Sequence, residues 1–387
     1  MNNKLPPLWL VVGLMMFPQI VETIYSPVLT HIASQFQVSE GQASQTLSVY
    51  FLAFAVGVVC WGRLCDLIGR RPAMLAGLLT YGAGTLLALL ANQFETLLLA
   101  RIISAFGAAV GSVVTQTMLR DSYQGSDLAR VFSVMGIALS LSPVLGLLSG
   151  GQLASGFGYL GVFSGLLILA VGLLLVTCWQ LPETRPATTR QVALWPLACR
   201  MMKDGGLWRS AMLVALFNTM LFGYYSLAPF LFAGLGLSAN EFGYSGILLA
   251  LATLVGSLLN KHLLGRGWLP SSLIRLACTL ALVAGLLVWA SQSSLWFLLP
   301  MMGIVVAFGL AIPNVLSQAL LAYREVAGSA GALFGLGYYL LLSLGLAVAA
   351  GLQDLGLLLS GCGLLALFCS WRRSRETSVA DKAVADT

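Results

Sequence analysis

Apolar runs of about 20 residues or more, separated by short polar interruptions, dominate the pattern of hydrophobic and polar positions. A run of that length lets a helix cross the hydrocarbon of a bilayer, and hydropathy predicts about twelve such helices. The predicted spans are residues 8–33, 44–62, 73–91, 96–119, 129–153, 158–180, 208–233, 241–262, 272–290, 295–320, 329–351 and 355–371. We therefore predict an all-α membrane protein with no room for a soluble domain. The first run is too long for a signal-peptide core and is predicted to be retained.

One long hydrophilic connection, residues 182–207, interrupts the repeated spans. It divides the chain into an N-terminal block, residues 1–181, and a C-terminal block, residues 208–371, each with six of the predicted spans. Two six-helix bundles around a central cavity are the arrangement expected of parallel structural repeats. Residues 372–387 are basic and then polar, and we predict that they form a disordered cytoplasmic tail.

Composition excludes a water-soluble fold, because 58% of the 387 residues are hydrophobic and only 9% are charged. A net charge of +6 could indicate nucleic-acid binding in a soluble protein, but here the distribution of charge matters more than its sum. Lys and Arg gather at alternate loops, whereas the loops on the opposite side carry acids only: Glu40, Glu95, Glu241 and Asp354. The positive-inside rule then places both termini in the cytoplasm. The bilayer is the expected surroundings, and no nucleic-acid partner is expected.

The cysteines and histidines give no sign of a disulfide framework or a metal site. All 7 cysteines lie within the predicted spans or toward the cytoplasmic face. His31 and His262 lie on opposite sides of the membrane, and the sequence contains no Cys-x-x-Cys pair. We therefore expect neither a metal nor a cofactor.

Two ionisable side chains fall inside predicted spans. Glu22 lies near the middle of the first span, where a charged carboxylate costs a few kcal/mol and the neutral form is favoured. It is either a protonated side chain bonded to a neighbouring backbone group or a site for protons and substrate. Arg101 lies about five residues inside the fourth span, where it needs a partner or must extend to the outer surface. A direct or water-linked pair with Glu22 would meet that need.

The connection between the second and third spans combines charge with turn residues. It reads Gly62-Arg-Leu-Cys-Asp66-Leu-Ile-Gly69-Arg70-Arg71-Pro. Taken alone, the arginines would do no more than fix the topology. The whole pattern resembles the signature loop between spans 2 and 3 of the major facilitator superfamily. In that family the loop Asp, here Asp66, helps to hold the cytoplasmic gate, and the arginines pair with an acid like Asp121, which follows Arg120 at the inner end of span 4.

Other segments extend the resemblance over nearly the whole chain. Arg101 and Gly107 match the span 4 motif of proton-coupled facilitators, whereas Ser104 and Ala105 depart from it. The centre of the Gly- and Pro-rich span 5, Ser142-Pro143-x-x-Gly146, looks like the motif of drug:proton antiporters, although dense helix packing alone would favour the same residues.

The most similar branch of the family is that of bicyclomycin and chloramphenicol resistance, whose first span reads Asp-x-Tyr-x-Pro. Tyr25 and Pro27 match this pattern, and Thr23 takes the Asp position. Glu22 precedes it by one residue, an offset of about 100° around the helix. This likeness implies a bacterial inner-membrane protein.

Candidate substrate contacts are spread over both blocks. Polar and aromatic side chains in the spans could line a pocket for amphipathic molecules, although such residues more often serve packing or lipid contact. The candidates are Tyr25, Gln116, Phe217, Asn218, Tyr225, Asn314, Gln318 and Tyr338.

The leading hypothesis is a monomeric, proton-coupled antiporter that exports small amphipathic compounds by alternating access, with Glu22 and Arg101 carrying the coupling. A transporter dedicated to one metabolite, such as a siderophore, a sugar or an amino-acid derivative, is the alternative. A membrane enzyme would need clustered His, Asp or Glu at one depth, and the spans contain no such cluster. A membrane scaffold or sensor that transports no substrate would not need two ionisable groups inside the membrane.

Overall fold

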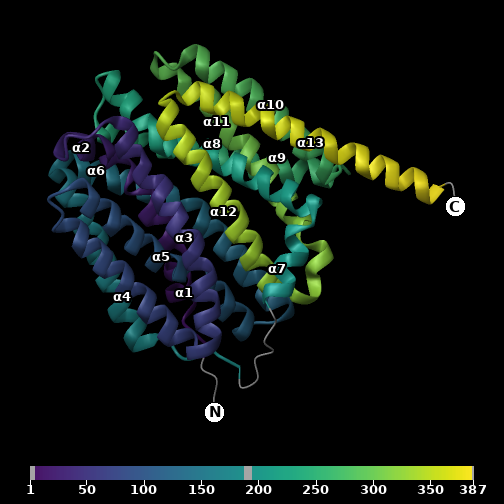
Figure 1. The fold of residues 1–387 in the computed structure, drawn as a ribbon, viewed down its shortest axis with the longest axis horizontal. Coiled ribbons are helices and arrows are strands. Elements are labelled where there is room, and N and C mark those ends of the chain that lie inside the picture. Colours follow the sequence, from purple (N-terminus) through teal and green to yellow (C-terminus); the bar gives the residue numbers. More distant parts are fainter. Residues whose placement is uncertain (1–4, 187–193, 386–387) are drawn as a thin grey trace. The chain divides into compact units, whose positions relative to one another are not determined.

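The computed structural model describes residues 5–186 and 194–385, and the described chain is helical without strands. It divides into two compact units (Figure 1). Unit 1 contains Met1–Val192 and Gly236–Gly246, and unit 2 contains Ala193–Leu235 and Ile247–Thr387.

The helices of unit 1 belong to the first half of the chain. They are α1 (Leu8–Thr23), the short 3-10 helix η1 (Ser26–Val28), α2 (Leu29–Gln35), α3 (Glu40–Ile68), α4 (Arg70–Leu89), α5 (Phe94–Ser122) and α6 (Gly125–Gln180). Those of unit 2 are α7 (Leu194–Met202), α8 (Gly205–Gly234), α10 (Pro270–Ser291), η2 (Leu295–Phe297), α11 (Leu298–Ala319), η3 (Leu321–Val326), α12 (Ala327–Leu352) and α13 (Leu355–Ala385). Helix α9 (Ala239–Gly265) begins in unit 1 and continues in unit 2.

The described helices account for all the spans that hydropathy predicts. Ten segments are long and apolar enough to cross a membrane. One of them, Arg130–Gln180, holds 51 residues and is broken at Gly158, whose φ of 59° interrupts the helix, so that α6 supplies two crossings. The shorter apolar helix Leu355–Trp371 supplies the last one. The prediction of an all-α membrane protein is confirmed.

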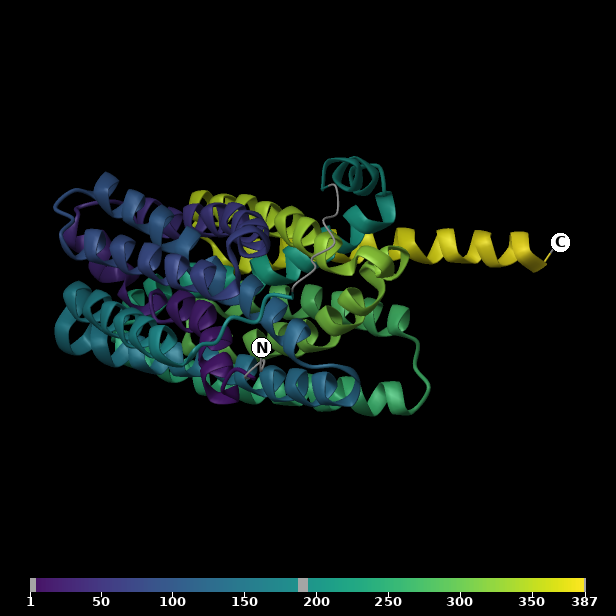
Figure 2. The ribbon, with the colours of Figure 1, turned by 90° about the horizontal axis from the view of Figure 1, so that it is seen from below.

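Two local predictions differ from the structure. The segment from Gly62 to Pro72 is not a loop throughout, because α3 continues to Ile68 and α4 begins at Arg70. Gly69 alone makes the turn, with φ 106° in the region that favours glycine. At the other end of the chain α13 continues to Ala385, through residues for which we predict a disordered tail (Figure 2). Residues 372–385 contain neither Gly nor Pro, so nothing in the sequence stops the helix there.

Helix α1 is held between α5 and α6 by glycines. A Cβ atom on Gly111 of α5 would lie 2.7 Å from the carbonyl oxygen of Leu14, and one on Gly146 of α6 would lie 2.9 Å from that of Ile20. Both positions therefore require the absence of a side chain, which lets the helix backbones approach closely.

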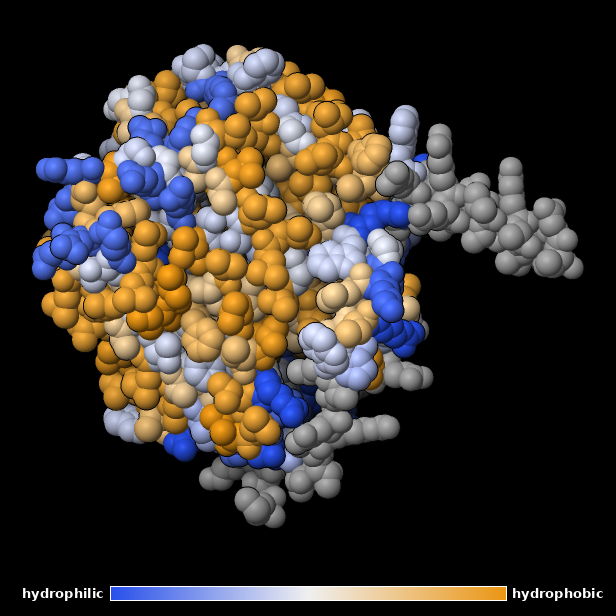
Figure 3. Space-filling model, in the orientation of Figure 1, coloured by the Kyte–Doolittle hydropathy of each residue, from blue (hydrophilic) through white to orange (hydrophobic). Residues whose placement is uncertain are grey.

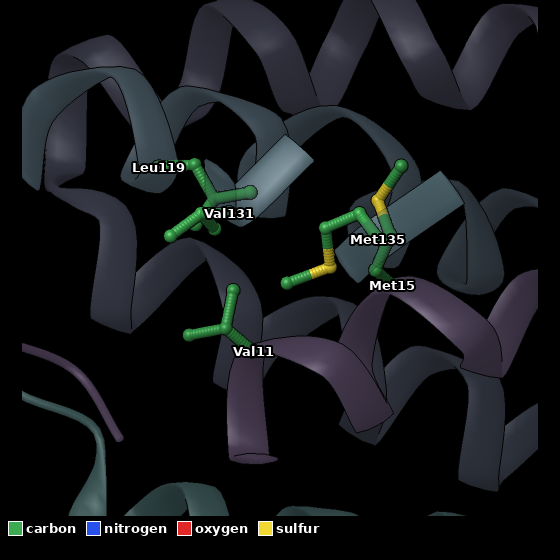
Figure 4. Packing of buried hydrophobic residues seen from close by; sticks show 5 residues of the cluster. All are labelled: Val11, Met15, Leu119, Val131 and Met135. Carbon is green, nitrogen blue, oxygen red and sulfur yellow. The ribbon is translucent and has the colours of Figure 1, made fainter. Parts of the chain in front are cut away.

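An apolar cluster packs the same three helices near the start of α1 (Figure 4). Val11 and Met15 of α1 meet Leu119 of α5 and Val131 and Met135 of α6, and all five are at most 8% exposed. Because this cluster lies two turns before Glu22 along α1, apolar packing fixes the approach to the polar part of the helix.

The surface of both units carries many large apolar side chains, as the orange residues in Figure 3 show. Exposed examples are Ile137, Ile168, Leu254 and Leu344. In a soluble protein such a surface would favour aggregation, whereas in a bilayer it faces the acyl chains.

Candidate functional site

The first part of the candidate site is Glu22 at the irregular end of α1. Pro18 lies inside this helix, and the helix gives way to a 3-10 turn at Ser26. The Glu22 side chain is buried, with the residue 5% exposed, and it makes no hydrogen bond or ion pair within the described residues. The neighbouring Thr23 hydroxyl instead donates to the Gln19 carbonyl at 2.8 Å. A buried carboxyl without a partner must be neutral or meet a group from outside the chain.

Arg101 on α5 lies in the same region and is 1% exposed. Its guanidinium carbon lies 3.8 Å from the ring centroid of Tyr25 and 4.3 Å from that of Tyr50. The side chain is thus buried among aromatic rings and does not extend to the surface. Two of its nitrogens, Nε and Nη2, have no hydrogen-bond partner in the described chain, so cation–π contacts stabilise the charge in place of a salt bridge.

Three tyrosines complete what we call the buried polar cluster: Glu22, Tyr25, Tyr50, Tyr81 and Arg101. The Tyr25 hydroxyl donates to Oγ1 of Thr46 on α3 at 2.8 Å. The hydroxyl of Tyr50 on α3 has no partner in the described chain. Tyr81 on α4 is the third buried tyrosine. Arg101 acts electrostatically on Glu22 and on all three tyrosines. Buried polar atoms are seldom left unpaired, so this concentration of them makes the cluster the candidate functional site of unit 1.

The remaining substrate candidates belong to other helices or to more distant turns of α5. Gln116 is on α5, 15 positions after Arg101 and hence about 22 Å further along the helix. In unit 2, Phe217 and Tyr225 of α8 are buried in the core, and Gln318 and Tyr338 are partly buried on α11 and α12.

Two side-chain amides proposed as substrate contacts, those of Asn218 and Asn314, already form hydrogen bonds within unit 2. The Asn218 side chain donates to the Val214 carbonyl at 2.8 Å. Nδ2 of Asn314 donates to Oδ1 of Asn260 at 2.6 Å and to the Leu310 carbonyl at 2.7 Å. The Asn314 contact joins α9 to α11, so this side chain has a packing role in the described structure.

The charges around Gly69 form a second polar site, which we call the turn network: Asp66, Arg70, Asp121 and Glu183. Arg70 is 3% exposed and donates from Nε to Asp121 at 2.7 Å and from Nη1 to Asp66 at 2.8 Å. The contact with Asp121 joins the start of α4 to the end of α5. The arrangement matches the pairing that the signature loop implies.

Arg71, Gly62 and Arg120 have other surroundings. Arg71 donates to the Cys178 carbonyl at 2.6 Å, and Arg120 is exposed at the end of α5. Gly62 lies inside α3, where a Cβ atom would meet the Val113 side chain at 3.4 Å. This glycine therefore does not end the helix.

The span 5 motif lies against α1. Ser142 is fully buried and donates to the Ala138 carbonyl at 2.9 Å within its own helix. Pro143 follows it, and Gly146 contacts the stretch of α1 between Ile20 and Thr23. These contacts are explained by close packing of α6 against α1. This packing fixes the position of the α1 segment that carries Glu22.

Sequence reasoning missed Glu183, Tyr50 and Tyr81 as site residues. Glu183 accepts from the backbone N–H of Arg70 at 2.9 Å and of Arg71 at 3.2 Å, and so caps the start of α4. An acid directly after an apolar run was the available signal, but its partner lies more than 100 positions earlier. The two tyrosines gave no signal, because aromatic residues in spans are common.

Two helical units, with ionisable groups buried in one of them, are the architecture expected of a membrane transporter. The model of the Major Facilitator Superfamily matches residues 10–346, and the chain belongs to this family. The protein is therefore a multi-pass transporter and not an enzyme, as the sequence predicts.

Several known proteins of this superfamily are similar to the chain in sequence or in fold. An uncharacterized transporter of Rickettsia bellii is 33% identical over 355 residues, covering 87% of both chains. Multidrug resistance protein D of Escherichia coli is 28% identical, covering 91% of both. Chloramphenicol and bicyclomycin resistance proteins of other bacteria are also similar, which confirms the predicted branch. The crystal structure of a bacterial homologue of the human lysosomal transporter Spinster has the same fold, with a TM-score of 0.71, 18% identity and coverage of 95% and 96% of the two chains.

Proposed function

We propose that this protein exports small amphipathic compounds from the bacterial cytoplasm in exchange for protons. It works by alternating access between two six-helix bundles, residues 1–181 and 208–371, joined by the connection 182–207, and both termini are cytoplasmic. The observation that carries the proposal is the buried polar cluster, in which a carboxyl without a partner lies within electrostatic reach of an arginine that has no salt bridge. The resistance proteins among its relatives support export of drugs.

In the proposed cycle Glu22 alternates between a neutral and a charged form. A proton arriving from the acidic outer side neutralises Glu22, which weakens its hold on a bound compound and releases it. Loss of that proton on the inner side restores the charge, which Arg101 stabilises, and the site binds the next molecule. The unpaired hydroxyl of Tyr50 provides a hydrogen-bond partner for the proton or a water molecule during the exchange.

The turn network has a different part in the proposed cycle. Asp66, Arg70 and Asp121 form a gate on the cytoplasmic side, where they hold the ends of α3, α4 and α5 together while the substrate site is open to the outside. Gly69, Arg71 and Arg120 belong to the same turn region.

Replacement of Glu22 by Gln tests the proposal. We expect E22Q to lose pH-driven transport in reconstituted vesicles entirely, because Gln cannot release a proton, while the protein remains folded. Glu40, an exposed acid in the first turn of α3, provides the matched control, and E40Q should transport normally. The measurement follows proton movement with a pH-sensitive dye for a panel of candidate compounds.

Two results would change the conclusion. Full pH-gradient coupling in E22Q would show that Glu22 does not carry the proton. Proton movement in response to one compound alone would indicate a transporter dedicated to one metabolite.

A further inference from the structure

The guanidinium of Arg101 has two aromatic contacts and one free edge. Its central carbon lies 3.8 Å from the ring centroid of Tyr25 and 4.3 Å from that of Tyr50. Nε and Nη2 form the edge with which an arginine can bind a carboxylate through two hydrogen bonds, and neither has a partner in the described chain. Because no ion pair of Arg101 exists among the described residues either, the two rings hold the side chain in its position.

The two rings are themselves fixed by other contacts. The Tyr25 hydroxyl donates to Oγ1 of Thr46 at 2.8 Å, and Oγ1 of Thr46 donates to the Ala43 carbonyl at 2.6 Å, so the Tyr25 ring is tied to α3. The Tyr50 ring stacks on that of Phe54 one turn later, with centroids 6.1 Å apart and 25° between the planes. All these side chains are buried. Rings fixed in this way favour a single position of the guanidinium that lies against them.

One cation acts on Glu22. In the described chain Arg101 is the only charged group with an electrostatic effect on this carboxyl. The other titratable groups around the pair are tyrosine hydroxyls: Tyr25 directly after α1, Tyr50 on α3, Tyr81 on α4 and Tyr159 on α6. Tyrosines are neutral at physiological pH. The separation of Arg101 from Glu22 therefore decides how strongly the charged form of Glu22 is favoured.

We propose that the rings of Tyr25 and Tyr50 hold Arg101 away from Glu22 and so set the pH at which Glu22 releases its proton. Without the rings, the free edge of Arg101 would move to the carboxylate, and a direct ion pair would keep Glu22 charged. With the rings, the cation has neutral partners and Glu22 can take up a proton again. The two tyrosines are thus positioning residues that act through Arg101. This inference rests on the proposed function, in which Glu22 carries the proton.

Tyr25 offers a matched pair of variants. Y25F and Y25L both lose the hydrogen bond to Thr46, but only Y25L loses the ring. Infrared spectroscopy of the full chain in vesicles follows the C=O band of protonated Glu22, identified as the band that E22Q lacks, through a pH titration. We expect the midpoint of this titration to fall by about one pH unit in Y25L, because Arg101 can then approach the carboxyl. Y25F should keep the midpoint of the unmodified protein.

Two controls separate the ring from its surroundings. Loss of the Tyr25 ring would also admit water, which favours a charged carboxylate without any part of Arg101. If the ring acts through the arginine, Y25L/R101Q has the same midpoint as R101Q, since Gln carries no charge to move. Phe163 lies edge-on to Tyr25, with ring centroids 5.9 Å apart, so F163L removes a ring from the same region and should leave the midpoint unchanged.

The contrary outcomes are distinct. An unchanged midpoint in Y25L, or an equal fall in Y25F, would show that the ring does not hold Arg101 away from Glu22. A fall of the same size in F163L, or from R101Q to Y25L/R101Q, would assign the effect to packing or water and overturn the proposal. If Y25L does not fold, Y50L removes the second ring and takes its place. Coupled transport in E22Q would overturn the role of Glu22 in antiport without altering this titration, so the two failures are distinguishable.

Discussion

Unit 1 contains two polar sites that differ in whether their charged side chains have partners. In the turn network the Arg70 guanidinium donates to the carboxylates of Asp66 and Asp121 and to the Cys65 carbonyl. In the buried polar cluster Arg101 meets only aromatic faces, and Glu22 meets no partner. A paired site holds helices in place, because breaking it leaves a buried charge without compensation. An unpaired site contributes little to stability but can bind a proton or a ligand.

The largest change in stability should come from the turn network. Replacement of Arg70 by Ala removes both ion pairs and leaves Asp121 partly buried without its partner, which should lower the free energy of unfolding by about 3 kcal/mol. D66N should cost only about 0.5 kcal/mol, because the Asp66 side chain is 41% exposed. Thermal unfolding in detergent measures both. Equal losses would contradict a network centred on Arg70 and Asp121.

Glycine contacts around α1 come next. A methyl group on Gly146 would overlap Thr23 and the backbone of Ile20, so G146A should destabilise the protein by about 2 kcal/mol and disturb transport through the position of Glu22. Gly136 on the same helix has open space around it. G136A should leave stability unchanged or raise it by about 0.5 kcal/mol, because Ala favours a helix. If both variants behave alike in thermal unfolding, the close contact of α6 with α1 is not required.

Capping of α4 should have a smaller effect. The E183A change leaves the first N–H groups of α4 without their acceptor, at a cost of about 1 kcal/mol. E183Q keeps an acceptor oxygen and should cost about half as much, since it loses only the charge at the helix N-terminus. Hydrogen exchange of the Arg70 and Arg71 amides reports the cap directly, and unchanged protection in E183A would argue against it.

Two tyrosines of the buried polar cluster should differ in their effect on stability, and Y50F should have the smallest effect of all these variants. Y25F loses a buried hydrogen bond to Thr46 and should be destabilised by about 1 kcal/mol. Y50F loses a hydroxyl that has no partner, so its stability should not fall, yet its proton-coupled transport should. Thermal unfolding and vesicle transport, measured on both variants, test the division. A Y50F protein that is less stable but transports normally would mean that the hydroxyl has a structural partner.

The sequence alone determined the fold class, the number and order of the spans and the family, because each depends on the hydrophobic pattern and on one compact motif. It also selected Glu22 and Arg101, since ionisable groups inside apolar runs are conspicuous. Only the tertiary structure decided what surrounds them. The contacts of Arg101 with the rings of Tyr25 and Tyr50, and the cap that Glu183 forms on α4, join residues far apart in the chain through helix packing. Hydropathy records that a residue is buried, but it carries no information about which buried groups meet, and that is why side-chain pairing had to come from the fold.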